Sequence, residues 1–294
     1  MNSKNKFIVV ILITLFTLIS CSKDEQVLTQ SGDIQTIKKS PKRGLAYDLK
    51  DPADLDALKS GVSWWYNWYF KTTAPQDYYK TYQMEFIPML WGHNSDADFT
   101  QAKEFILSHP EIKYLLVLNE PNLIDQANMT PYDAAEEWKK YESLVAELKN
   151  KDRTVYLVGP AMNWGTMSGY NDPVTWLDDF YTAYIVQNNN KLPQIDYLAF
   201  HWYDYGLEAQ LDRLAKYGKK IWITEMANWN PQINSYEKQA EQMKQMVALC
   251  ESRSDVFRYA WFIGRGAEDK YSNLFNAASG ELNDLGKLYI SLPY

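Results

Sequence analysis

The sequence predicts an α/β protein, specifically a (β/α)8 TIM barrel. From residue 43 onward, short apolar runs alternate with helical patterns. Several runs are almost continuously apolar, as expected for strands buried on both faces of a parallel sheet. Eight such runs in about 250 residues are typical of this barrel. The alternative, an open doubly wound sheet, usually has a glycine-rich phosphate turn after its first strand, and the sequence contains none there.

The expected strands follow one another along the whole length of this region. They are residues 43–47, 62–68, 85–90, 114–118, 154–160, 195–202, 220–224 and 256–262.

Helices are expected between these strands, and three of their starts are clearly marked. Asp51-Pro52, Thr130-Pro131 and Asp172-Pro173 each place a capping oxygen before a proline that suits the first helical position. Apolar residues at helical spacing follow after residue 131, after residue 239 and after residue 281. Cys250 falls in one of these patterns, which predicts a buried structural thiol.

The first residues resemble an export signal rather than part of the fold. Lys4 and Lys6 precede a short apolar run that ends at Ser20, directly before Cys21. This pattern predicts a lipoprotein signal peptide over 1–20, with lipid on Cys21. Residues 21–40 are polar and aperiodic and are expected to form a flexible tether. The barrel is expected to occupy 41–294, and the protein to be anchored to the outer membrane of the cell envelope, with the cell surface as one of the locations left open.

The composition limits the classes of partner. The formal net charge is -7, which disfavours nucleic acid and anionic membrane surfaces, because both attract clusters of lysine and arginine. We therefore expect contact with the membrane only through the lipid anchor, and a monomer. The three histidines lack ligand spacing with carboxylates, so neither a metal nor another cofactor is expected.

Polar and aromatic side chains gather where the predicted strands end. In such a barrel, the carboxyl ends of the strands carry the chemistry. Tryptophan faces stack on sugar rings, and amide, imidazole and phenol groups bind hydroxyls, so this composition favours a sugar-binding cleft. Trp91, Trp164 and Trp229 lie just past strand ends. Trp64 and Trp65 are adjacent and point in opposite directions, so only one is expected to line the cleft.

Two carboxylates end otherwise apolar strands. Glu120 follows YLLVLN, and Glu225 follows IWIT. A buried charge at such a position is costly unless it is solvated or hydrogen-bonded, and arginine is sparse nearby. A pair of carboxylates across a barrel mouth suits glycoside hydrolysis, in which one is protonated and the other ionised. Glu120 and Glu225 are therefore the predicted catalytic residues.

Several segments of the chain resemble the motifs of known glycosidases. Asn119-Glu120-Pro121 and Glu225 are similar to the acid/base and nucleophile of the retaining (β/α)8 glycosidases of clan A. The wider resemblance extends from about residue 44 to 285, and its segments are VSWWYNW (62–68), EFIPMLWG (85–92), FHWY (200–203), WITE (222–225) and YAWF (259–262). In combination these segments resemble glycoside hydrolase family 128, which comprises endo-β-1,3-glucanases and related cell-wall proteins.

The resemblance implies a role for individual residues. Glu120 becomes the general acid/base, Glu225 the nucleophile, and Asn119 the residue that holds the sugar 2-hydroxyl. His201 or Tyr203 is expected to orient the nucleophile. The expected sugar contacts are Asn67, Trp68, Trp91, Asn163, Trp229 and Trp261, and His93 is a further possible contact.

The resulting hypothesis is a lipid-anchored retaining endo-β-1,3-glucanase that acts on laminarin or curdlan-type β-glucan. Two alternatives remain open. One is a non-catalytic glycan-binding lipoprotein, which has no need of two carboxylates at strand ends. The other is a retaining endo-hydrolase of another β-glycan, such as mixed-linkage glucan, mannan or xylan.

Overall fold

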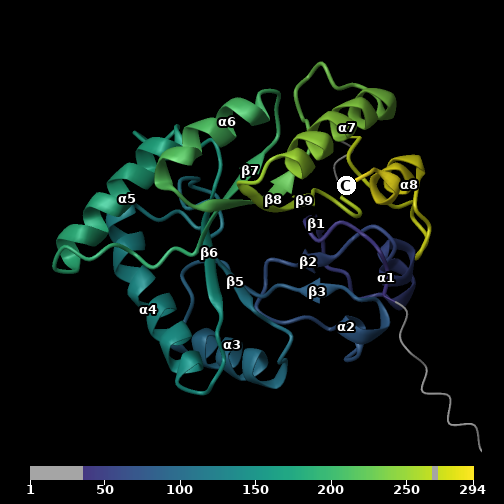
Figure 1. Cartoon of the computed structure of the whole chain (residues 1–294). Helices are drawn as coiled ribbons and strands as arrows, with labels where there is room; N and C mark the ends of the chain where they lie inside the picture. Colours follow the sequence, from purple (N-terminus) through teal and green to yellow (C-terminus); the bar gives the residue numbers. More distant parts are fainter. Residues whose placement is uncertain (1–35, 267–270) are drawn as a thin grey trace, which may run out of the picture. The chain divides into compact units, whose positions relative to one another are not determined.

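The computed structural model describes residues 36–266 and 271–294, and the residues from Thr36 onward form one compact unit. Nine strands form a single parallel sheet in the order β3-β2-β1-β9-β8-β7-β6-β5-β4 (Figure 1). Only Ile87 and Pro88 separate β3 from β4 in the chain, so the two ends of this order adjoin and the sheet forms a ring. The predicted (β/α)8 barrel is confirmed.

Each strand overlaps its predicted run, with bounds that differ by up to two residues, and the third run is split in two. Pro88 interrupts that run, but its carbonyl accepts from Leu116 N, so the pairing continues past the break. The strands are β1 Arg43–Ala46, β2 Trp64–Tyr66, β3 Glu85–Phe86, β4 Met89–Leu90, β5 Tyr114–Val117, β6 Tyr156–Met162, β7 Tyr197–Trp202, β8 Lys220–Met226 and β9 Val256–Trp261.

Helices surround the ring, and the three marked starts are confirmed. The side chains of Asp51, Thr130 and Asp172 accept hydrogen bonds from backbone N–H groups in the first turns of α1, α4 and α5. The helices are α1 Pro52–Leu58, α2 Tyr78–Thr81, α3 Asp96–Ser108, α4 Pro131–Lys149, α5 Pro173–Gln187, α6 Leu207–Leu214, η1 Ala215–Tyr217, α7 Tyr236–Ser252 and α8 Asp284–Ser291.

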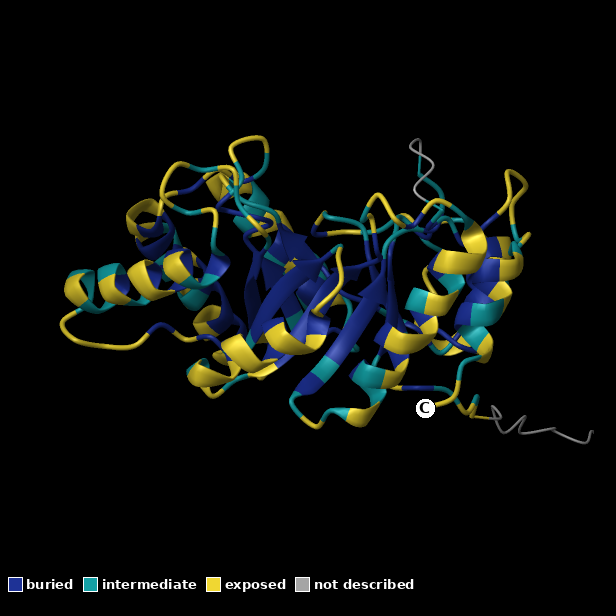
Figure 2. Ribbon diagram, turned by 90° about the horizontal axis from the view of Figure 1, so that it is seen from above, coloured by how far each residue is buried: buried dark blue, intermediate teal, exposed yellow. Residues whose placement is uncertain are grey.

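The core has two layers, one inside the ring and one between the ring and the helices. In Figure 2 the strands are dark blue, whereas the helices are yellow on their outer faces. Trp64 points into the ring and Trp65 points outward. A Cβ on Gly44 would lie 2.2 Å from the Trp64 ring, so glycine makes room for that indole. Both indoles are fully buried, and neither lines the cleft described below, contrary to the expectation that one would.

Aromatic rings and one guanidinium fill the amino-terminal end of the ring. Arg258 lies over the rings of Tyr114 and Trp222, 5.0 Å from each centroid. Its Nη2 is 2.8 Å from a carboxylate oxygen of Glu85. Cation–π contacts and an ion pair therefore compensate for the burial of this charge.

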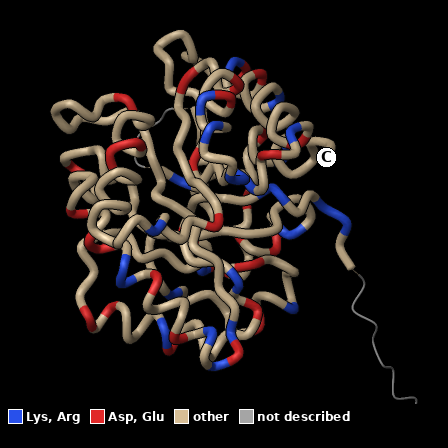
Figure 3. The backbone as a smooth tube through the Cα atoms, turned by 60° about the vertical axis from the view of Figure 1, so that its left-hand side comes forward, with Lys and Arg blue, Asp and Glu red and all other residues tan. Residues whose placement is uncertain are grey.

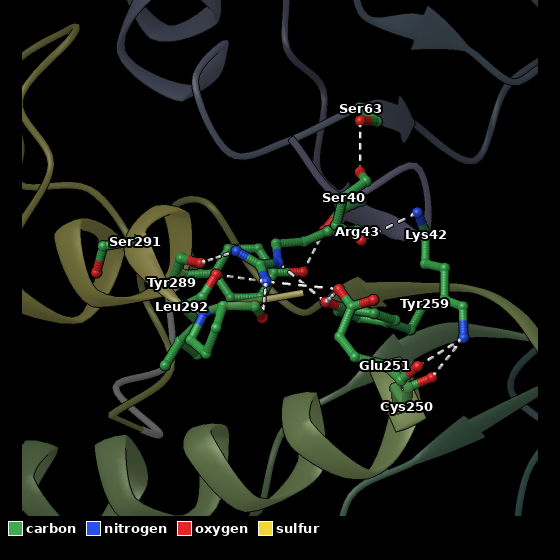
Figure 4. A network of polar contacts seen from close by, with 12 residues as sticks. Ser40, Lys42, Arg43, Ser63, Cys250, Glu251, Tyr259, Tyr289, Ser291 and Leu292 are labelled. Carbon is green, nitrogen blue, oxygen red and sulfur yellow. Dashed lines mark hydrogen bonds and ion pairs between the residues drawn. The ribbon is translucent and has the colours of Figure 1, made fainter. Parts of the chain in front are cut away.

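A second buried arginine joins the first strand to the end of the described chain (Figure 4). Arg43 is 1% exposed. Its guanidinium donates to the Tyr259 hydroxyl and to the carbonyl oxygens of Tyr289, Leu292 and Pro293. The Arg43 guanidinium therefore connects β1 to β9 and also to the end of α8 and the residues that follow it.

Most of the expected export segment lies outside the described residues, including 1–20 and Cys21. The last residues of the expected tether are described, and they contact the barrel. The Lys39 ammonium donates to the carbonyl oxygens of Lys59, Val62 and Tyr82.

The other cysteine lies in the core, and the surface carries both signs of charge. Cys250 is buried and free, as predicted. Basic and acidic residues are interspersed along the chain (Figure 3). Among the described helices, none has the length and apolar character to span a bilayer.

Candidate active site

A cleft of about 750 Å³ opens at the carboxyl ends of the strands. This is the end at which (β/α)8 enzymes carry their chemistry. The lining residues come from strand ends and from the loops that follow β2 and β4 to β9, and they are Trp68, Trp91, Asn119, Glu120, Leu123, Gln126, Asn163, Trp164, Tyr203, Asp204, Glu225, Trp229, Phe262 and Ile263.

Glu120 enters this cleft just after β5, on a backbone of unusual conformation. Its φ is 46° and that of Leu118 is 54°, a left-handed region that costs free energy for non-glycine residues. Hydrogen bonds from Asn119 N to Trp91 O and from Glu120 N to Ala161 O, both 2.7 Å, hold the segment in place. The strained turn therefore aims the carboxylate from a fixed position between β4 and β6.

Glu120 is 7% exposed, and its carboxylate is bound from two sides. Asn163 Nδ2 donates to its Oε1 over 2.7 Å, and His201 Nδ1 lies 2.7 Å from the same oxygen. Asn163 is held in turn by Asn122, which is fully buried and donates to the Asn163 carbonyl over 2.7 Å. The loop after β6 therefore presents its amide to Glu120.

Glu225 lies within β8 and accepts hydrogen bonds on both oxygens. The Tyr66 hydroxyl and Trp68 Nε1 each donate to Oε1 over 2.7 Å. The Tyr203 hydroxyl donates to Oε2. Three neutral donors therefore fix the plane of this carboxylate and stabilise its charge.

His201 joins the two carboxylates. Its Nδ1 is 3.3 Å from Glu225 Oε2, in addition to the contact with Glu120, and its side chain is 0% exposed. Glu120, His201 and Glu225 each offer an atom within 4.8 Å of the others. Three such side chains could also hold a metal ion. We interpret them as one hydrogen-bonded group instead, because His201 Nδ1 already contacts an oxygen of each carboxylate.

These contacts set the protonation of the group. Burial raises the pKa of Glu120, but His201 and the hydrogen bonds from His201 and Asn163 outweigh it, so the pKa is lowered overall. Burial lowers the pKa of His201, but the charges of Glu225 and Glu120 outweigh it, so the pKa is raised overall. Burial, followed by the Glu225 charge, raises the pKa of Tyr66 and Tyr203 well above the usual range. Both phenols therefore stay neutral donors at alkaline pH.

Asn119 presents an unsatisfied oxygen. Its Nδ2 donates to Gln126 Oε1 over 3.2 Å, whereas its Oδ1 is buried and has no partner within the described part of the chain. A buried polar atom without a partner is costly. Both residues line the cleft, where a ligand hydroxyl would supply the missing hydrogen bond.

Aromatic side chains form the walls of the cleft. Tyr203 and Trp229 are stacked with ring centroids 4.0 Å apart, and Phe262 packs edge-on against both. The Trp164 ring is 48% exposed. These flat apolar surfaces suit the C–H faces of sugar rings.

Most of the site residues predicted from the sequence line the cleft or lie directly beneath it. Two do not. Asn67 Nδ2 instead donates to Asp48 Oδ1 and to the Lys71 carbonyl. Trp261 is fully buried and donates to the Ser272 carbonyl. His93 faces a separate hollow beside α4.

The sequence analysis did not identify three contributors to the site. Tyr66, Gln126 and Phe262 occupy the positions described above. The alternation of Trp64, Tyr66 and Trp68 could have revealed Tyr66, because these residues share one face of a strand. No comparable sequence signal marks Gln126, which lies in a loop.

A buried pair of carboxylates at the mouth of a (β/α)8 barrel, flanked by tryptophan, defines the class of glycoside hydrolases. The family model of the glycosyl hydrolase catalytic core matches residues 44–289. A solved endo-β-1,3-glucanase of family 128, subgroup II, from Pseudomonas viridiflava is 55% identical, with a TM-score of 0.82, over 87% of this chain and 100% of that chain. Another from Sorangium cellulosum is 32% identical, with a TM-score of 0.73, over 86% and 98%. The chain therefore belongs to glycoside hydrolase family 128.

A more distant relative is a longer protein. The Alkali-sensitive linkage protein 1 of Schizosaccharomyces pombe is 28% identical over 267 residues. The match covers 86% of this chain but 45% of that protein, so the chain spans less than half the length of this relative.

Proposed function

We propose that the protein is a retaining endo-β-1,3-glucanase. The observation that carries this proposal is the buried pair Glu120 and Glu225, with carboxylate oxygens within 4.8 Å of one another in the cleft. Carboxyl groups about 5–5.5 Å apart are typical of retention, whereas inverting enzymes need about 6.5–9.5 Å to admit a water molecule. The short separation therefore supports a covalent intermediate.

In the first step, Glu225 attacks the anomeric carbon and forms a glycosyl ester. The bond from that carbon to the departing oxygen breaks, and Glu120 gives a proton to this oxygen. The donors Tyr66, Trp68 and Tyr203 keep the Glu225 carboxylate in one orientation before the attack.

In the second step, Glu120 removes a proton from water, and the resulting nucleophile attacks the same carbon. The ester to Glu225 breaks, so two inversions give net retention. Asn119 binds the 2-hydroxyl through its unpartnered Oδ1, an interaction that strengthens in the transition state.

β-1,3-Glucan is the proposed substrate because the two similar bacterial enzymes are endo-β-1,3-glucanases. The test incubates the purified protein with laminarin, curdlan and β-1,3-gluco-oligosaccharides, beside mixed-linkage glucan, mannan and xylan. We expect hydrolysis of the β-1,3-glucans, and an early product by NMR with the β-configuration. If only another β-glycan is cleaved, the substrate assignment is wrong, but the proposed retaining mechanism still stands. Binding without any hydrolysis would favour a glycan-binding protein.

Single replacements test the two roles. Glu120→Gln and Glu225→Gln are each expected to abolish turnover of laminarin, with little change in melting temperature. With a substrate that has an activated leaving group, Glu120→Gln should still form the intermediate, because that departure needs no acid. Near-wild-type turnover of laminarin in either variant would contradict the assignment.

We also propose that the protein is a lipid-anchored monomer of the cell envelope. The basic residues, apolar run and Cys21 in the sequence support this location. Incorporation of a labelled fatty acid into the wild-type protein, but not into Cys21→Ala, tests it.

A further inference from the structure

His201 is the only cationic group that the described residues place beside the catalytic pair. The residues that line the cleft include no lysine or arginine, yet Glu120 and Glu225 are both nearly buried. Two adjacent carboxylates without a cation repel one another and retain a shared proton. A base placed between them provides an alternative site for that proton.

The position of the imidazole suits this role. Its Nδ1 is 2.7 Å from Glu120 Oε1 and 3.3 Å from Glu225 Oε2. Glu120 faces it from the end of β5, and Glu225 from β8. The other titratable groups that the described residues place around the pair are Tyr66 from β2 and Tyr203 just after β7, which are neutral donors to Glu225, and Asp204, which lines the cleft.

We propose that His201 holds, in the free enzyme, the proton that Glu120 later gives to the departing oxygen. This inference rests on the proposed function. His201 acts through Glu120 and is therefore a positioning residue rather than a catalytic one.

The transfer is balanced in both steps. In the first, the proton passes from His201 Nδ1 to Glu120 Oε1 along their 2.7 Å contact, and from Glu120 to the oxygen whose bond to the anomeric carbon breaks. The imidazole is then neutral. In the second, Glu120 takes a proton from water, and that proton returns to Nδ1 as Glu225 leaves as a carboxylate.

The raised pKa of His201 agrees with this geometry. A group whose pKa is raised keeps its proton to higher pH. The alkaline limit of activity then marks the pH at which the group formed by His201 and Glu120 loses its shared proton.

NMR of the imidazole rings tests the inference on the wild-type protein. The sequence has only three histidines, so His93→Asn and His109→Gln assign the signals by elimination. We expect His201 to be an imidazolium at pH 7. In Glu225→Gln, one counter-charge is removed, so its titration should move down by about one pH unit or more.

Kinetics of His201→Gln provide the second test. Glutamine is uncharged and accepts no proton between pH 5 and pH 8, so in this variant the proton for the departing oxygen must reside on Glu120 alone. The alkaline limb of kcat/KM should then move to lower pH, with a loss at pH 8 at least about 10-fold larger than at pH 5. His93→Asn is the matched control: it lies outside the cleft, asparagine tolerates the left-handed backbone there, and the profile should stay unchanged.

The outcomes separate this inference from the proposed function. A neutral His201 at pH 7 in an enzyme that cleaves laminarin would overturn the inference alone. A loss in His201→Gln that is equal at all pH values would also overturn it, because a purely structural role predicts that result. Failure to cleave any β-glycan would overturn the proposed function, while the NMR titration would still report the charge of His201.

Discussion

Removal of the Tyr66 hydroxyl isolates one of the donors that hold the proposed nucleophile. In Tyr66→Phe, Glu225 Oε1 loses a 2.7 Å hydrogen bond but keeps the one from Trp68. The ring of Tyr66 is fully buried inside the barrel, and phenylalanine fills the same space. The change is therefore confined to one hydrogen bond and to the orientation that it imposes on the carboxylate.

The structure sets the size of the expected effect. A hydrogen bond to a charged group contributes about 1.5–3 kcal/mol. Because Trp68 still binds the same oxygen, the lower half of that range applies. Each 1.36 kcal/mol corresponds to about a factor of ten in rate, so kcat/KM should fall about 10-fold to 50-fold.

The assay compares kcat/KM on laminari-oligosaccharides with that of a matched variant. Tyr141→Phe also removes a buried hydroxyl, but that hydroxyl has no partner within the described residues. It lies on α4, on the outer side of the barrel. We expect Tyr141→Phe to keep wild-type activity, and both variants to keep their melting temperature within a few degrees.

Two results would refute this reasoning. Tyr66→Phe within twofold of wild type would mean that Trp68 and Tyr203 alone fix the carboxylate. An equal loss of activity in Tyr141→Phe would mean that the assay reports general loosening of the barrel rather than the contact with Glu225.

Further predictions concern the cleft wall and the closure of the ring. Trp229→Ala should raise KM about 10-fold, because it removes about 1.5 kcal/mol of apolar contact with a sugar. Trp261→Phe should leave KM unchanged, because that indole is buried against Ser272. Equal KM values for the two variants would contradict the placement of Trp229 in the cleft wall. Arg43→Met should destabilise the fold by about 3–5 kcal/mol, because it leaves the carbonyl groups of Tyr289, Leu292 and Pro293 without their donor and removes the counter-charge of Glu251. Urea unfolding measures the loss, and a value below about 1 kcal/mol would show that water replaces the guanidinium.

The elements that could be predicted from the sequence depend on local physical chemistry. Asp51, Thr130 and Asp172 mark helix starts because a cap and a following proline act within a few residues. The apolar runs mark strands because both faces of the barrel are buried. Glu120 and Glu225 stand out because charges are rare at the ends of such runs.

The rest depends on which face of a strand points inward, and sequence alone does not settle this. Trp261 faces the helices and the next residue, Phe262, lines the cleft. The pairing of β8 with β9 shifts register twice, so a regular alternation cannot be counted along β9 from its neighbour. Gln126 reaches Asn119 from a loop, and such a contact has no period to reveal it.

The tie between Arg43 and the residues after α8 has a consequence for how the barrel is assembled. The first strand of the ring is secured by carbonyl groups about 250 positions further along the chain. A growing chain therefore carries an open-edged sheet until almost all of the described residues have emerged. Contacts between residues so far apart in the sequence form slowly, so the closure of the ring must come late in folding. A partially synthesised chain is consequently vulnerable to aggregation through its unpaired edges.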